Sequence, residues 1–138
     1  GMTVLSVQAT APRLLIVEPD RLVRSTVSGV CRDLDLAQVH QAATVAVGLQ
    51  MLQSQAFDLW LVSLAEGDVA LDLIERLRRG EFVTRTDVPV AVMAASADAQ
   101  VVQRLKRLGI RRLLLQPFKI RDVAVTVETL CGALTVQA

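Results

Sequence analysis

The chain has 138 residues and a formal net charge of +1, which is the size of one domain and too little charge to attract nucleic acid or a membrane surface. Hydrophobic residues make up 52% of it, which excludes a disordered chain. The longest apolar run, Val88–Ala97, is about half of the ~20 residues that a membrane-spanning helix needs.

The first half of the sequence alternates between apolar strands and amphipathic helices. A continuous apolar run at 14–17 predicts a strand buried on both faces. Asp20 is a candidate cap for a helix whose apolar residues recur along one face from 23 to 34. A weaker strand at 39–42 follows, and Thr44 can cap the next helix.

The second half repeats the same alternation. The predicted elements are a strand at 59–62, a helix at 70–77, a strand at 90–93, a helix at 101–108, a strand at 113–115 and a helix at 120–130. Gly80 and Gly109 stand where the third and fourth helices should stop. Strict alternation predicts an α/β fold, a doubly wound five-stranded parallel sheet with five helices on its two faces. Ligands of such sheets bind at the carboxyl ends of the strands.

The few metal-ligating and thiol residues predict structural roles. Cys31 and Cys131 are far apart in the sequence, form no Cys-x-x-Cys motif and lie in apolar helical patterns, so we expect buried thiols and neither a zinc site nor a disulfide. His40 lies on a predicted edge strand with no second ligand near it, so we expect it to be solvated or hydrogen-bonded.

The ends of the chain are expected to lie outside the domain. Gly1 ahead of Met2 is interpreted as the remnant of an expression tag, and residues 1–12 as a flexible arm. The domain is expected over 13–131, with a frayed tail at 132–138. Since the first residues lack the pattern of a secretory signal, we expect a cytoplasmic protein.

The turn after the first strand carries neither a G-x-G-x-x-G nor a GxxxxGK[ST] motif, which excludes the common nucleotide-binding loops. Six segments, in order and at the right spacing, resemble one known family: LLIVEPD (14–20), QAATVAVGLQML (41–52), FDLWLVSL (57–64), ALDLIERLR (70–78), VPVAVMAAS (88–96) and GIRRLLLQPF (109–118). From Arg13 to Leu130 the chain resembles a CheY-like receiver domain of two-component response regulators. The resemblance implies the strand order 2-1-3-4-5.

In that family, carboxylates after strand one and an acceptor Asp after strand three hold Mg²⁺, while a hydroxyl and a Lys bind the phosphoryl group. This sequence departs from the pattern at most of these positions: Glu18 keeps the first acidic place, Pro19 replaces a metal-binding Asp, Ser63 the acceptor Asp, Ala94 the hydroxyl and Gln116 the Lys. A shift of the alignment would bring Ser96 to the hydroxyl place or Asp20 to the metal, but would restore neither the acceptor nor the Lys.

The losses are mutually consistent, because two carboxylates and the cation that would offset them are missing together. Glu18 and Asp20 alone make a poor site for a hard cation, and Asp20 is better explained as a helix cap. Ser63 lacks the histidine and oxyanion donors of a serine nucleophile. We therefore expect no catalytic residue, no metal and no cofactor, Mg²⁺ included.

Two neighbouring features follow from the resemblance. Receivers usually have a cis bond before the proline after strand five, which implies a structural cis peptide at Gln116–Pro117. Leu113 holds the place where receivers often carry an aromatic switch residue, and a leucine cannot report phosphorylation through a hydrogen bond.

Basic residues gather between the fourth helix and the start of the fifth, on the side that receivers commonly use for dimers and effectors. The predicted partner-binding residues are Arg104, Arg107, Arg111, Arg112, Leu113 and Lys119. Arginine pairs well with carboxylates, so an acidic protein partner or a homodimer is the expected occupant, against the alternative of a merely solvated face. Nucleic acid is disfavoured, since no aromatic residues accompany the basic ones.

We therefore interpret the chain as a pseudo-receiver: a phosphorylation-independent module for protein interaction in bacterial signalling, and not an enzyme. Two alternatives stay open, an active phosphorylatable receiver and a small-molecule sensor that uses the neutralised pocket.

Overall fold

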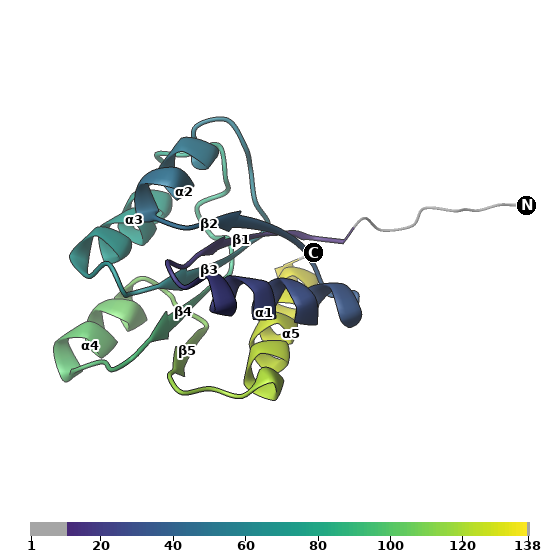
Figure 1. The fold of residues 1–138 in the computed structure, drawn as a ribbon. Coiled ribbons are helices and arrows are strands. Elements are labelled where there is room, and N and C mark those ends of the chain that lie inside the picture. Colours follow the sequence, from purple (N-terminus) through teal and green to yellow (C-terminus); the bar gives the residue numbers. More distant parts are fainter. Residues whose placement is uncertain (1–10, 138) are drawn as a thin grey trace, which may run out of the picture.

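The computed structural model describes residues 11–137 of the chain. The elements are β1 (Arg13–Val17), α1 (Arg21–Asp33), β2 (Gln38–Ala42), α2 (Val45–Leu52), β3 (Leu59–Ser63), α3 (Asp68–Arg78), β4 (Val90–Ala94), α4 (Ala99–Arg107), β5 (Arg112–Leu115) and α5 (Ile120–Gln137). The strands form one parallel sheet in the order β2-β1-β3-β4-β5, with helices on both faces (Figure 1). The predicted fold class and strand order are confirmed.

The sheet separates two apolar cores. Alternate residues of a strand point to opposite faces, so Trp60 of β3 packs beside α2, α3 and α4, whereas Leu59 and Leu61 pack beside α1 and α5. All residues of β3 and β4 are buried, as expected of inner strands covered on both faces. The edge strand β2 buries only Ala42.

The helix boundaries follow from local chemistry that the sequence contains. The Asp20 carboxylate accepts hydrogen bonds from the backbone N–H groups of Leu22 and Val23, and the Thr44 hydroxyl accepts one from Val47. Gly80 and Gly109 follow the ends of α3 and α4 with φ of 78° and 70°, the left-handed conformation in which glycine is not strained. The predicted caps and stops are therefore confirmed.

The end of the chain differs from the expectation. Helix α5 continues to Gln137, so the residues 132–137 that we expected to form a frayed tail are helical. Leu134 explains part of this extension, because its side chain packs against the core under α1 and α5 and thereby stabilises another helical turn. Most of the expected N-terminal arm, residues 1–10, lies outside the described residues.

The histidine and the cysteines have structural surroundings. His40 accepts a hydrogen bond from Arg13 Nε (3.4 Å) and lies edge-on to the Phe57 ring. Cys31 is fully buried, Cys131 is half-buried, and neither is in a disulfide. Burial raises the pKa of the Cys31 thiol to about 11, which suits a packing role rather than a reactive one. Among the described residues, no helix is both long and apolar enough to cross a membrane.

Candidate functional site

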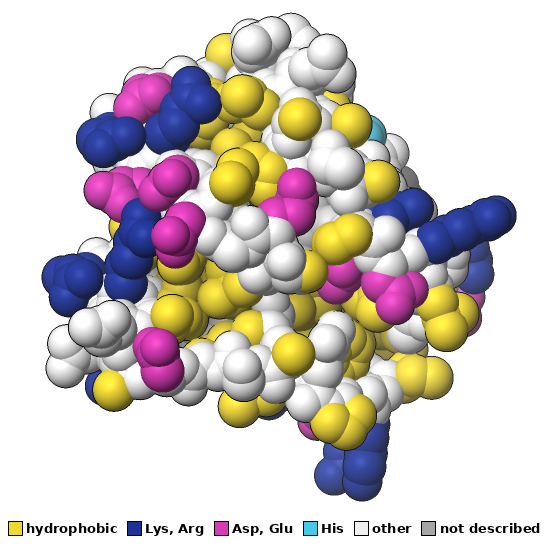
Figure 2. Space-filling view, turned by 60° about the vertical axis from the view of Figure 1, so that its left-hand side comes forward, with side chains coloured by type: hydrophobic (Ala, Val, Ile, Leu, Met, Phe, Trp, Pro, Cys, Tyr) yellow, Lys and Arg dark blue, Asp and Glu magenta, His cyan; other side chains and the backbone are white. Residues whose placement is uncertain are grey.

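A pocket of about 630 Å³ opens at the carboxyl ends of β1, β3, β4 and β5. Its lining consists of Glu18, Pro19, Asp20, Ser63, Leu64, Ala65, Ala94, Ala95, Ser96 and Gln116. The six positions predicted as a degenerate phosphorylation site are thus brought together. Figure 2 shows this face with apolar side chains in its hollowed middle and charged side chains of both signs toward its left and right margins.

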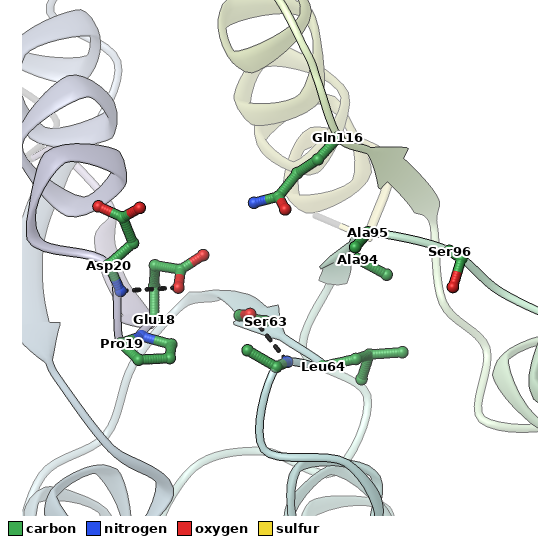
Figure 3. A pocket seen from close by; sticks show the side chains of 10 residues that line it. Glu18, Pro19, Asp20, Ser63, Leu64, Ala94, Ala95, Ser96 and Gln116 are labelled. Carbon is green, nitrogen blue, oxygen red and sulfur yellow. Dashed lines mark hydrogen bonds between the residues drawn. The ribbon is translucent and has the colours of Figure 1, made fainter.

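Glu18 is the most unusual residue of the pocket. Its side chain follows β1 and is buried, with 2% of the residue exposed. Oε2 accepts a hydrogen bond from the backbone N–H of Asp20 (3.0 Å), whereas Oε1 has no hydrogen-bond partner. Burial raises the pKa of Glu18 and the Asp20 charge adds to this rise, whereas hydrogen bonding from the Asp20 N–H and from the Ser63 side chain opposes it. Figure 3 shows the unpartnered oxygen pointing into the pocket.

Arg24 supports the same loop from outside the pocket. One of its guanidinium nitrogens donates to the backbone carbonyls of Glu18 (2.8 Å) and Pro19 (3.0 Å). It also contributes a small lowering of the pKa of Glu18. Sequence reasoning missed Arg24, since it lies on α1 and no motif links it to the loop.

Asp20 and Ser63 are both engaged by backbone groups. Asp20 Oδ1 lies 2.8 Å from the N–H of Leu22 and 3.3 Å from that of Val23, as a helix cap. Ser63 ends β3, is buried, and its hydroxyl oxygen accepts a hydrogen bond from the Ala65 N–H (3.1 Å). The single histidine of the chain, His40, is hydrogen-bonded to Arg13 and does not line this pocket.

The opposite wall carries no charge. Ala94 ends β4 without a hydroxyl, and the Ser96 hydroxyl points away from Glu18 (Figure 3). The backbone N–H of Gln116 donates to the Ala94 carbonyl (2.8 Å), which places the Gln116 amide over the pocket. The Gln116–Pro117 peptide bond is cis, as the resemblance implies.

These residues do not fit a bound Mg²⁺ ion. Hard divalent cations are held by several oxygen ligands, mainly carboxylates. Here Pro19 supplies no side-chain oxygen, Asp20 caps α1, and Ser63 stands in the place of a carboxylate. Within residues 11–137, no group of three or more His, Cys, Asp or Glu side chains could hold a metal ion.

The predicted basic face is divided rather than continuous. Arg107 and Arg111 are exposed near the amino end of β5, beside Arg78 in a smaller pocket, whereas Lys119 follows the carboxyl end of β5. Leu113 packs partly against the core beneath α3 and α4, and Arg112 is half-buried with its Nε unpartnered.

Arg104, one of the predicted partner-binding residues, is paired with two carboxylates within the domain. One guanidinium nitrogen lies 2.6 Å from Glu75 and 2.9 Å from Asp72, both on α3. These two carboxylates raise the pKa of Arg104. They come from another helix, so the helical pattern around Arg104 could not indicate them.

Comparison with known proteins places the chain in a family. The sequence profile described as "Response regulator receiver domain" matches residues 14–128. A response regulator from Thermotoga maritima has 25% identity and a TM-score of 0.76, with 89% of this chain and 99% of that one covered.

Two further solved structures agree. The non-phosphorylated HemR receiver domain from Leptospira biflexa has 27% identity and a TM-score of 0.74, over 86% of this chain and 93% of that one. A CheY-like receiver domain protein from Methanospirillum hungatei JF-1 shares 18% identity, and its TM-score of 0.81 over 94% of this chain and 100% of that one shows a common fold. The chain therefore belongs to the response regulator receiver domain family, the signalling domains of two-component systems.

Proposed function

We propose that this receiver domain acts without phosphorylation, as a cytoplasmic module that contacts other signalling proteins. The observation that carries the proposal is the chemistry of the pocket. Ser63, a neutral hydroxyl, stands at the end of β3 where the resemblance places the acceptor carboxylate, and Gln116 supplies an amide in place of a cation. Phosphoryl transfer needs a nucleophile together with positive charge that offsets the developing negative charge, and both are replaced here.

The direct test is incubation of the protein with acetyl phosphate and Mg²⁺, followed by intact mass spectrometry. We expect no gain of a phosphoryl group and no Mg²⁺-dependent change in the amide NMR spectrum around Ser63. A stable, Mg²⁺-dependent phosphorylated species would refute the proposal and support the alternative of an active receiver.

A matched variant makes a negative result informative. The triple variant Pro19→Asp, Ser63→Asp and Gln116→Lys puts the missing carboxylates and cation back at positions that already share one pocket. We expect this variant to bind Mg²⁺ and to accept a phosphoryl group under conditions in which the wild type does not. Failure of the variant would show that the surrounding loops are also unsuited to the reaction.

For the contact surface we propose the exposed part of the β5–α5 side. Arg107, Arg111 and Lys119 are exposed there, as are the apolar residues Leu115 (49%) and Ile120 (65%). Arg107 and Arg111 lie near the amino end of β5, whereas Lys119, Leu115 and Ile120 lie at its carboxyl end. Protein interfaces combine arginine with exposed apolar groups, and an acidic partner or a second copy of the chain suits a surface that spans both ends.

Charge reversal tests this surface. Arg107→Glu with Arg111→Glu should weaken partner binding or self-association at least tenfold, measured by ultracentrifugation for the homodimer and by calorimetry for a partner. Arg32→Glu on α1, whose side chain is 76% exposed, provides the control charge change outside the surface. An equal effect of both changes would point to net charge rather than to a binding face.

A further inference from the structure

The pocket contains a buried carboxylate oxygen that no donor meets at hydrogen-bonding geometry, although the Ser63 hydroxyl lies close enough to lower the pKa of Glu18. Glu18 is 2% exposed, its Oε1 has no partner, and this oxygen points into the open space between β1 and β5 (Figure 3). An unpartnered buried acceptor is costly, and the cost falls when a ligand supplies the missing donor. The pocket therefore has a place for a donor group.

The charges around the pocket favour a cation. Glu18 and Asp20 both line it, and no lysine or arginine does so among the described residues. Arg24 donates to the backbone carbonyls of the Glu18 loop, at 2.8 and 3.0 Å, and its charge contributes only a small lowering of the pKa of Glu18. A positive donor group bound at Oε1 would thus gain both a hydrogen bond and a charge attraction.

The arrangement of acceptors selects among the cations. Glu18 Oε2 is already used by the Asp20 N–H, so one carboxylate oxygen is left and a planar guanidinium cannot bind in its two-pronged manner. A compact ammonium group needs only single acceptors in different directions. The Gln116 side-chain amide faces the pocket from the opposite wall with its nitrogen toward Glu18 (Figure 3), and a half-turn of this amide would present its carbonyl oxygen as a second acceptor.

The rest of the lining suits an alkyl chain. Pro19, Leu64, Ala94 and Ala95 contribute apolar side chains to the same pocket, whose volume of about 630 Å³ is ample for a small molecule. We propose that the pocket binds a small primary alkylamine, with its ammonium group at Glu18 Oε1 and Gln116 and its alkyl chain over the apolar lining. This inference goes beyond the proposed interaction role and does not depend on it.

The test uses n-propylammonium chloride as the probe, titrated into the full chain at constant ionic strength and followed by two-dimensional amide NMR. We expect saturable shifts at Asp20, Ser63, Ala65 and the Gln116 side-chain amide, with a Kd on the order of millimolar, in line with the small size of the probe. Tetramethylammonium chloride, which has no N–H donor, should leave these signals unchanged. Equal responses to the two salts would overturn the proposal.

Two variants test the assignment to Glu18 and Gln116. Glu18→Gln keeps the shape and should weaken propylammonium binding at least tenfold, whereas Glu128→Gln removes the same charge from an exposed site on α5 and should not. Gln116→Lys should also weaken binding, because its own ammonium reaches the same acceptor. Binding that survives Glu18→Gln, or shifts at these residues with Mg²⁺ but not with propylammonium, would overturn the proposal.

Discussion

At the scale of single residues, Glu18 is a buried carboxyl group with only one of its two oxygens hydrogen-bonded. Carboxyl groups are rarely buried without a partner, because burial disfavours the charged form. Half of the Glu18 carboxyl is satisfied by the Asp20 N–H, and the other oxygen is not. Burial raises the pKa of Glu18, and hydrogen bonding from the Asp20 N–H and the Ser63 side chain offsets only part of this rise.

This predicts that Glu18→Gln changes the pH dependence of stability. The folded protein binds the Glu18 proton more tightly than the unfolded chain does, so stability from this group is present at acid pH and is lost as pH rises from about 4.5 through the raised pKa. The variant lacks this loss, and at neutral pH we expect it to be more stable by roughly 1 kcal/mol. Urea unfolding at several pH values measures the difference; one that stays constant with pH would contradict the prediction.

The sequence predicted where the pocket lies, but not which hydrogen bonds its side chains make. Glu18, Ser63, Ala94 and Gln116 could be placed together because each follows a strand, and the carboxyl ends of parallel strands meet at one edge. The unpartnered Oε1 of Glu18 depends on side-chain directions in three dimensions, which the sequence pattern does not contain.

At the scale of elements, Asp20 caps the amino end of α1 and so determines where this helix begins, although it also lines the pocket. Asp20→Ala removes the acceptor for the N–H groups of Leu22 and Val23. We expect a loss of about 1 kcal/mol in the free energy of unfolding. Asp20→Asn is the control, since asparagine caps helices about as well as aspartate does; a similar loss in both variants would mean that the charge rather than the cap matters.

Contacts between elements were the least predictable part. Arg78 donates to the backbone carbonyls of Thr86, Val88 and Leu108, which joins the end of α3 to the loops before β4 and after α4. For this region the sequence indicated only that Gly80 ends the helix. Arg104 likewise appears free in its own helix and is paired only because α3 lies beside α4.

At the scale of the whole molecule, the alternation of strands and helices sufficed to predict the sheet, its parallel direction and its two covered faces. The periodicity of α5 predicted where this helix starts but not that it continues to Gln137, because that extension rests on packing of residues such as Leu134 against the core. The strand order came from the family resemblance, as alternation alone admits other orders.

The two cores share one set of strands, and this predicts a single cooperative unfolding transition. Leu130 on α5 is fully buried in the core beneath α1 and α5, while Trp60, the only tryptophan, is buried in the core on the other face. Leu130→Ala should destabilise the domain by about 3 kcal/mol.

In Leu130→Ala, the unfolding transition followed by Trp60 fluorescence should shift to a lower urea concentration. The transition followed by far-UV circular dichroism should shift by the same amount, although the substitution lies on the opposite face of the sheet from Trp60. The reason is that Leu59 and Leu61, which flank Trp60 in β3, pack in the same core as Leu130. When that core unfolds, β3 loses its packing on one face, and Trp60 is on the same strand. A circular dichroism transition that moves while the Trp60 transition stays in place would mean that the two faces of the sheet unfold separately.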